Sequence, residues 1–459
     1  MIPTLLFALL ALLQQPNWTL GGSSSGAYTL VSTRGFALDR NGATITLRSD
    51  TASASSSGSI TGSVPADRFR RRRVRIIADI EVKNAVGGAS PWLRVDGKSG
   101  SLGSDYGTDN AVKGTSTGHR EITLYVPAAA TRIGFGLLLT GSGEATAKGL
   151  RIEAQPMSDV NAPLAPPAQR LLDSAITIVR ANSLWRDTVT WSQVLPEVRA
   201  AAAGAQSTSE VHPAIAMLLA RLGDHHSFIM KPQATRQFQT GATQNPLPVV
   251  KASSDSIGYI SVPAYSGGEQ QALLAYAKDV QDSLASALPR AGCKWVVDLR
   301  SNGGGNMWPM LGGLRPLLGE VGLGSFVSAG GSAPLWRASA WVDVKPTPAL
   351  AALDSAYVAV LTGPRTASSG EAVAISFRGR PRTRSFGLPT AGLSTANSGF
   401  MLPDGSMMLL TVSVEADRTG RRYGEKIDPD EVIPEGAPGT DLQLDRAKAW
   451  LKSQPSCKH

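Results

Sequence analysis

The first third of the chain alternates short apolar runs with breaks rich in Gly and Ser, a pattern typical of antiparallel β-strands joined by turns. Seven such runs occur, at residues 27–32, 44–48, 74–82, 92–95, 121–126, 132–139 and 149–154. Their spacing predicts an all-β sandwich over residues 17–155.

A stretch with four prolines, residues 156–169, follows this domain and predicts an extended linker. Residues 170–232 then show helical periodicity. In the third helix of this stretch, apolar side chains recur at spacings of three and four from Val211 to Leu222, and Gly223 predicts the helix end. We therefore expect a small helical region between the linker and the rest of the chain.

Short apolar strands and helices alternate through residues 233–445. Strands are predicted at 257–262, 295–299 and 357–362, and helices at 270–288, 307–318 and 369–378. Strand–helix–strand order at this spacing predicts right-handed parallel crossovers in an α/β core. Residues 446–459 are expected to form a C-terminal tail.

The first residues of the chain are apolar and uncharged from Ile2 to Leu13, which is the length of a signal-peptide core. This run predicts a signal peptide over residues 1–16 and a secreted or periplasmic protein. A buried N-terminal strand or helix is the alternative. No other stretch has the roughly 18 continuous apolar residues of a membrane helix, so we expect no stable membrane span.

Composition limits the chemistry. The 459 residues carry 45 basic and 36 acidic side chains, a formal charge of +9 that does not indicate a nucleic-acid partner. Six arginines between Arg68 and Arg75 fit either a solvated strand edge or a polyanion site, and we favour the strand edge. With five histidines and two cysteines, the sequence predicts no metal site and no cofactor. Whether Cys293 and Cys457 pair stays open.

Three segments could carry chemistry. In Thr366-Ala-Ser-Ser-Gly-Glu371, a serine follows a predicted strand and opens a helix, where free backbone N–H groups can hold an oxyanion. Read alone, this serine fits a helix cap better. The Gly-rich segment 298–305 (DLRSNGGG) lets the backbone approach a ligand closely, and it has no P-loop or dinucleotide spacing. The third segment, 222–228 (LGDHHSF), places two histidines just past a helix.

Together these segments resemble, in order, the motifs of the C-terminal-processing or tail-specific serine peptidases, a family that includes the tricorn core protease and the interphotoreceptor retinoid-binding domains. The resemblance covers roughly residues 170–440. It implies a crotonase-like, or ClpP-like, α/β peptidase core that acts on polypeptide substrates without a cofactor. Only 28 residues, 229–256, separate the helical region from the core, too few for the PDZ domain of many members.

The resemblance places the nucleophile on Ser368 and the oxyanion hole on the backbone N–H groups of Gly304 and Ser369. Some members use a lysine base 25 residues after the serine, but this chain has Leu393 there. The tricorn-like branch instead uses a histidine, which falls on His226.

In that branch a glutamate near the C-terminal Pro-Asp motif orients the histidine. The candidate here is Glu425, with Asp417 as a competitor. A serine hydroxyl needs a base to become nucleophilic near neutral pH, and a carboxylate would hold the imidazole in the required tautomer.

The N-terminal β-domain loosely resembles jelly-roll modules of the carbohydrate-binding kind, with Trp92, Asp105 and Asn110 as contacts for a glycan. A structural role or protein docking is an equal alternative. For the whole chain we expect a serine endopeptidase that works through an acyl-enzyme. The alternatives are a non-catalytic peptide-, lipid- or glycan-binding protein on the same scaffold, and an esterase.

Overall fold

The computed structural model describes residues 18–22, 25–35, 41–52, 56–98, 100–155, 161–240, 245–332, 335–437 and 439–456. The predicted signal peptide lies outside these residues, as does Cys457. The chain divides into two compact units, residues 1–177 with 189–223, and residues 178–188 with 224–459. No helix in the described ranges is long and apolar enough to cross a membrane.

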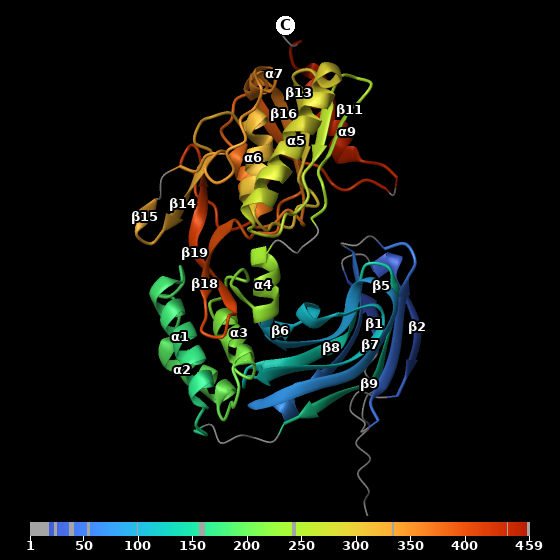
Figure 1. The fold of residues 1–459 in the computed structure, drawn as a ribbon, viewed down its shortest axis with the longest axis vertical. Coiled ribbons are helices and arrows are strands. Elements are labelled where there is room, and N and C mark those ends of the chain that lie inside the picture. Colours follow the sequence, from blue (N-terminus) through green and yellow to red (C-terminus); the bar gives the residue numbers. More distant parts are fainter. Residues whose placement is uncertain are drawn as a thin grey trace, which may run out of the picture. The chain divides into compact units, whose positions relative to one another are not determined.

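The first unit is built on one nine-stranded antiparallel sheet (Figure 1). Its strands are β1 (Thr19–Gly21), β2 (Thr29–Arg34), β3 (Ala43–Ser49), β4 (Ser57–Pro65), β5 (Arg72–Gly97), β6 (Gly100–Asp105), β7 (Val112–Val126), β8 (Ala130–Thr140) and β9 (Gly143–Ala154). Short 3-10 turns lie at η1 (Ser25–Ala27), η2 (Asp67–Phe69) and η3 (Thr108–Asn110). The predicted β-rich character of the N-terminal region is confirmed, with the strands joined in one sheet.

The long strand β5 explains why the strands form a single sheet. Its first part pairs with β7 and β9, its last part pairs with β6 and β8, and the register shifts between Val82 and Ala89. Alternate residues of the strands enter one apolar core, as period-two geometry requires.

Three helices follow the sheet: α1 (Pro166–Asn182), α2 (Trp191–Ala202) and α3 (His212–Ala220). Helix α1 begins inside the predicted linker, because Pro166 occupies a first helical position, where a missing N–H breaks no helical hydrogen bond. In the Arg-rich segment, Arg73 is not simply solvated. Its guanidinium donates to the carbonyl oxygens of Ala201 and Ala203 at the end of α2.

The second unit contains the predicted parallel sheet. Its strand order is β11-β12-β13-β16-β17-β20, in which only β11 is antiparallel to its neighbour. The strands are β11 (Val249–Ala252), β12 (Gly258–Ser261), β13 (Lys294–Asp298), β16 (Tyr357–Thr362), β17 (Thr383–Gly387) and β20 (Glu431–Val432). The predicted parallel crossovers are confirmed.

Helices cover both faces of this sheet (Figure 1). The helices that pack on it are α5 (Gln270–Ala291), α6 (Met307–Leu318), α7 (Pro348–Ala351), α8 (Ser369–Ser376) and α9 (Leu442–Ser453), with a 3-10 turn η4 (Ala352–Ser355). Helix α4 (Pro232–Thr240) contributes no residue to the cores on the two faces. Trp295 and Val297 of β13 pack with α5, α6 and α8, whereas Val296 between them packs with α9. The central strands are therefore apolar on both sides, as expected for a parallel sheet.

A second, five-stranded sheet in this unit centres on β19 (Met407–Asp417), which pairs with β10 (Phe228–Met230), β14 (Gly324–Ser328) and β18 (Thr395–Met401). β15 (Gly331–Ser332) pairs with β14. β13 and β16 are parallel neighbours in the first of these sheets, so the loops that follow them, residues 299–306 and 363–368, lie at the same edge. The segment with the two histidines leads into β10 of the second sheet.

An ion-pair network secures the end of β13. The Arg300 guanidinium donates to both oxygens of Asp441, at 2.7 and 2.8 Å, and also to Asp298. Asp441 in turn caps α9 by accepting the Leu444 N–H. The segment that enters the Gly-rich loop is thereby tied to the C-terminal helix.

Candidate active site

Ser368 lies on a sharp turn between β16 and α8. Its backbone has φ 52° and ψ −121°, a left-handed conformation that costs a residue with a side chain about 1–3 kcal/mol. The Ser368 N–H donates to Oε2 of Glu371 at 2.9 Å, which helps to hold that conformation. This geometry matches the strand-to-helix turn that exposes a nucleophilic serine in other folds.

His226 reaches Ser368 from a distant part of the chain. Its Nε2 lies 2.9 Å from the Ser368 Oγ. Asp224 fixes the turn by accepting the backbone N–H groups of His226 and Ser227, and the Asn397 amide donates to the His226 carbonyl. Burial lowers the pKa of His226 below 6.5, against a smaller opposing effect of the Asp224 charge. The ring is therefore neutral and basic near neutral pH.

The group on the other ring nitrogen differs from the predicted carboxylate. Nδ1 of His226 lies 2.7 Å from the Thr395 Oγ1. Glu425 is exposed, and only its backbone approaches the site, with the carbonyl oxygen accepting the Ser394 hydroxyl. The Asp417 carboxylate accepts the Tyr423 and Thr419 hydroxyls. Neither predicted carboxylate contacts His226: Asp417 is engaged by Tyr423 and Thr419, and the Glu425 side chain is exposed.

The Gly-rich loop lies directly against Ser368. A Cβ at Gly304 would fall 2.9 Å from the Ser368 Cβ, and φ there is +104°, so only glycine fits. The Gly304 N–H donates to the Asn302 side chain at 3.0 Å, so this predicted oxyanion donor is already engaged. The Ser369 N–H, the other predicted donor, has no acceptor within the described residues. The Ser369 hydroxyl donates to the Gly305 carbonyl at 2.7 Å, which joins the loop to α8.

Glu371 is the buried centre of the site. Its carboxylate accepts four hydrogen bonds, from the backbone N–H groups of Ser368, Gly392 and Leu393 and from the Thr390 hydroxyl. Burial raises the pKa of Glu371, and these four donors lower it. The sequence prediction gave Glu371 no role, although a carboxylate inside the apolar helix segment 371–377 was a signal for one.

A second buried carboxyl lies behind Glu371. Burial and the negative charge of Glu371 raise the pKa of Glu415 well above its usual range. Within the part of the chain that is described, Oε2 of Glu415 has no hydrogen-bond partner. Two buried carboxylates repel, so these contacts favour a neutral Glu415 beside a charged Glu371.

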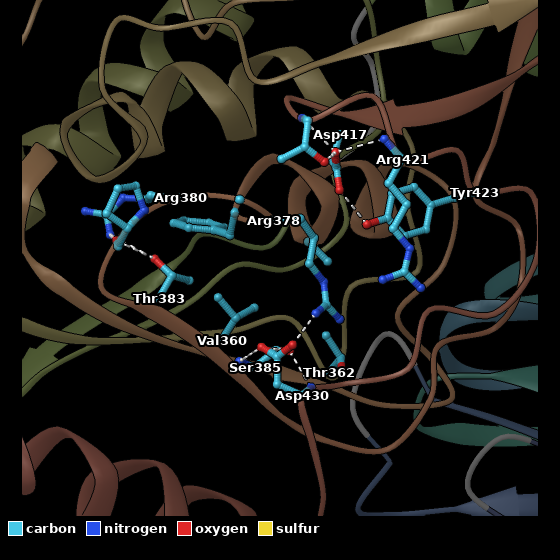
Figure 2. Close-up of a pocket in the computed structure, with 15 residues that line it drawn as sticks. Val360, Thr362, Arg378, Arg380, Thr383, Ser385, Asp417, Arg421, Tyr423 and Asp430 are labelled. Atoms are coloured by element: carbon cyan, nitrogen blue, oxygen red, sulfur yellow. Dashed lines mark hydrogen bonds and ion pairs between the residues drawn. The ribbon is translucent and has the colours of Figure 1, made fainter.

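A polar cavity of about 460 Å³ lies at the opposite end of α8 from Ser368 (Figure 2). Figure 2 shows Arg378 facing Asp430 across it, with a contact of 2.6 Å, and Tyr423 bonded to Asp417. Neither Ser368 nor His226 lines this cavity. In its walls Arg378 pairs with Asp430, and the Arg380 guanidinium donates to backbone carbonyl oxygens such as those of Leu317 and Ala356.

The predicted glycan contacts do not form an open platform. Trp92 is only 6% exposed and stacks on Tyr106 with ring centroids 5.9 Å apart, so its face is not free for a sugar. Asp105 accepts the Gly107 N–H, and Asn110 is exposed. Trp92 is not in the apolar core that the adjacent Leu93 enters; its ring lies over Gly134 and is covered by Tyr106. In the described ranges, no group of three or more His, Cys, Asp or Glu is placed to hold a metal ion.

Replacing Glu371 with Gln tests the structural role of the carboxylate. The amide NH₂ group would face N–H or O–H donors, so we expect about 2 kcal/mol lower stability of the second unit, measured by calorimetry. Glu435→Gln, at an exposed glutamate, serves as the matched control. Equal melting of the two variants would contradict the assignment.

Comparison with known proteins places the core in a family. Residues 256–433 match the model of peptidase family S41. The chain is 27% identical over 303 residues to the nisin-resistance protein of Lactococcus lactis subsp. lactis, covering 63% of this chain and 89% of that protein. A lipoprotein from Streptococcus agalactiae has a similar structure, with a TM-score of 0.55 and 26% identity over 63% of this chain and 98% of that one. The photosystem II D1 C-terminal processing protease gives a TM-score of 0.43 and 15% identity over 61% and 96%.

These findings confirm the resemblance to the processing peptidases that the three motifs indicated. The chain carries a peptidase family S41 domain at residues 256–433 and is a serine-type peptidase.

Proposed function

We propose that this protein is a serine endopeptidase that cleaves polypeptides through an acyl-enzyme on Ser368, with His226 as the general base. The observation that carries the proposal is the 2.9 Å contact between the His226 Nε2 and the Ser368 Oγ. A buried, neutral imidazole at hydrogen-bond distance from a strained serine is the arrangement that nucleophilic catalysis requires.

The proposed reaction has two halves. In the first, Nε2 of His226 takes the proton of Ser368 as Oγ attacks the peptide carbonyl, and the imidazolium then gives the proton to the leaving amine. In the second, water attacks the acyl-enzyme with the same base. The Ser369 N–H, which is free of an internal acceptor, would hold the oxyanion of each tetrahedral intermediate. We assign the second donor to the Gly304 loop, where the Gly304 N–H would turn from Asn302.

Thr395 takes the orienting role that we expected of Glu425. Its hydroxyl would accept the Nδ1–H of His226, which leaves Nε2 unprotonated and facing Ser368. Glu425 contributes only through its backbone, because its carbonyl oxygen accepts the hydroxyl of Ser394, the residue before Thr395. A hydroxyl stabilises the imidazolium less than a carboxylate does, which is consistent with the lowered pKa of His226.

We also propose the crotonase-like core that the family resemblance implies. The parallel strands β12 to β20 and the helices on both faces support this assignment. For the first unit, docking to protein or glycan stays a prediction, now without Trp92 as a contact.

We infer that the protein acts outside the cytoplasm, as a secreted or cell-envelope protein. The apolar residues 2–13 support this inference, and so does Cys293, which is disulfide-bonded. Two similar proteins, a nisin-resistance protein and a lipoprotein, agree with such a location.

Removing the nucleophile or the base should abolish proteolysis. For Ser368→Ala and His226→Ala we expect a loss of about 10³-fold or more in the hydrolysis of an unfolded protein substrate. Circular dichroism should show an unchanged fold. Hydrolysis at the wild-type rate by either variant would overturn the proposal.

The pH profile should report the buried base. Because only the neutral imidazole accepts a proton and its pKa lies below 6.5, the acid limb of kcat/KM should have an apparent pKa below 6.5. Activity should therefore persist in mildly acidic buffer and be lost as the pH falls below the pKa of His226 in the folded protein. An acid limb at or above pH 6.5 would contradict this account.

Thr395 and Glu425 can be separated by substitution. Thr395→Val should lower kcat about tenfold with KM nearly unchanged, because it removes the acceptor of the Nδ1–H. Thr395→Ser should restore the rate. Glu425→Gln should change kcat less than twofold, and a loss equal to that of Thr395→Val would return the orienting role to the carboxylate.

A further inference from the structure

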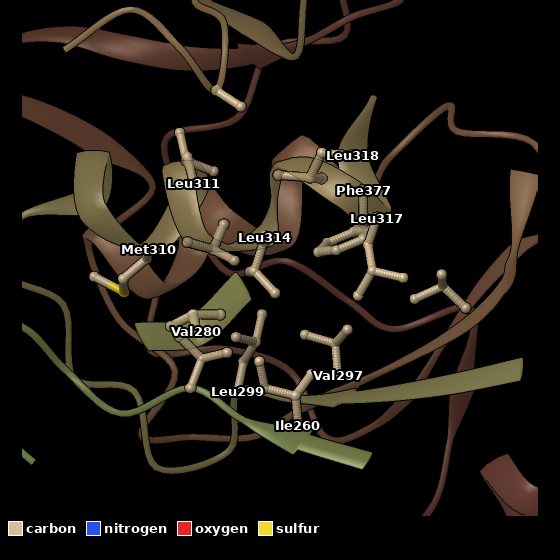
Figure 3. Close-up of a cluster of buried hydrophobic side chains, with 14 of the residues drawn as sticks. Ile260, Val280, Val297, Leu299, Met310, Leu311, Leu314, Leu317, Leu318 and Phe377 are labelled. Atoms are coloured by element: carbon tan, nitrogen blue, oxygen red, sulfur yellow. The ribbon is translucent and has the colours of Figure 1, made fainter. Parts of the chain in front are cut away.

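Trp308 is the only residue of helix α6 that is not buried. The other side chains of this helix, among them Met310, Leu314 and Leu318, pack into the core that Figure 3 shows. The Trp308 indole is partly buried against this core, and the rest of its apolar surface is exposed at the one position of the helix that is open to solvent.

A second indole meets it from another segment. Trp341 is 64% exposed, and its ring centroid lies 6.0 Å from that of Trp308. Its backbone is fixed, since the Gln270 side chain donates to the Trp341 carbonyl at 3.0 Å and the adjacent Val342 packs against Gly312 of α6. The pair is thus an exposed aromatic corner on a rigid support.

This corner continues directly from the loop beside the nucleophile. The Gly305 carbonyl accepts the Ser369 hydroxyl, and Asn306 caps α6 by accepting the Trp308 N–H. Trp308 lies three residues after Gly305, and three residues of chain span at most about 11 Å. An extended peptide covers the same distance with three to four residues. A substrate whose scissile bond lies at Ser368 therefore has side chains within reach of the two indoles.

We propose that Trp308 and Trp341 form a subsite for one aromatic or large aliphatic side chain of the polypeptide substrate, within four residues of the scissile bond. This proposal rests on the proposed function. The acidic groups of these segments are already engaged: Arg315 pairs with Glu320 and Asp343, and the Glu269 carboxylate caps α5 by accepting two backbone N–H groups. An indole face instead gains most from an apolar or aromatic partner.

The first test maps cleavage sites. Wild-type protein and the Trp341→Ala, Trp341→Phe and Val432→Ala variants digest an unfolded protein mixture, and mass spectrometry reads the products. Val432 is an exposed apolar residue on β20 and is the matched control. We expect about tenfold enrichment of aromatic or large aliphatic residues at one fixed position in the wild type. It should fall below about threefold in Trp341→Ala and persist in Trp341→Phe and Val432→Ala.

The second test needs no turnover and so separates the two proposals. Ser368→Ala protein, alone or with Trp341→Ala, is titrated with fluorescent decapeptides of Gly, Ser and Ala that carry one Phe, Lys or Ala at a scanned position. At one position the Phe peptide should bind the Ser368→Ala protein about tenfold more tightly than the Ala peptide, and Trp341→Ala should remove the difference.

Several results would overturn the subsite. One is a preference for aromatic or large aliphatic residues that Trp341→Ala leaves intact. Another is tighter binding of the Lys peptide than of the Phe peptide. A third is a Trp341→Ala variant whose cleavage and binding are unchanged and whose self-association, measured by sedimentation, is altered. If the wild type cleaves nothing while Phe-dependent binding holds, the endopeptidase proposal fails and the subsite stands.

Discussion

One buried carboxylate, that of Glu371, sets the geometry of the site. It accepts the N–H of Ser368 on one side and the N–H groups of Gly392 and Leu393 on the other. The nucleophile and the segment leading to Thr395 are thereby fixed to the same group. Burying this charge is costly, and its four donors offset that cost. The strained backbone of Ser368 persists because this network over-determines it.

The proposed base, His226, lies outside the residues that match the family. His226 precedes residues 256–433, whereas Ser368, Gly304 and Thr395 all lie within them. Asp224 and Asn397 hold the His226 backbone, and Thr395 and Ser368 hold its two ring nitrogens. The proposed acyl transfer therefore depends on one short turn that contacts a serine about 140 residues later in the chain.

What the sequence could predict was local. Alternating apolar strands and helices foretold the parallel sheet, and motif order pointed to Ser368 and His226. Thr395 was missed because its contact depends on the pairing of β18 with β19, with an irregularity just after Ala396. The nearby Pro-Asp motif pointed to Glu425, but its side chain is exposed to solvent. Trp92 failed as a glycan contact because Tyr106, fourteen residues later, stacks on its ring, and strand periodicity does not predict such a cover.

The central claim is that Ser368 is a nucleophile activated by His226. Its most direct test is covalent: the protein is incubated with a fluorophosphonate, and mass spectrometry locates the adduct. The account predicts a single adduct on Ser368, formed much more slowly in His226→Ala. No adduct, or an adduct on another residue at the same rate in both proteins, would contradict it.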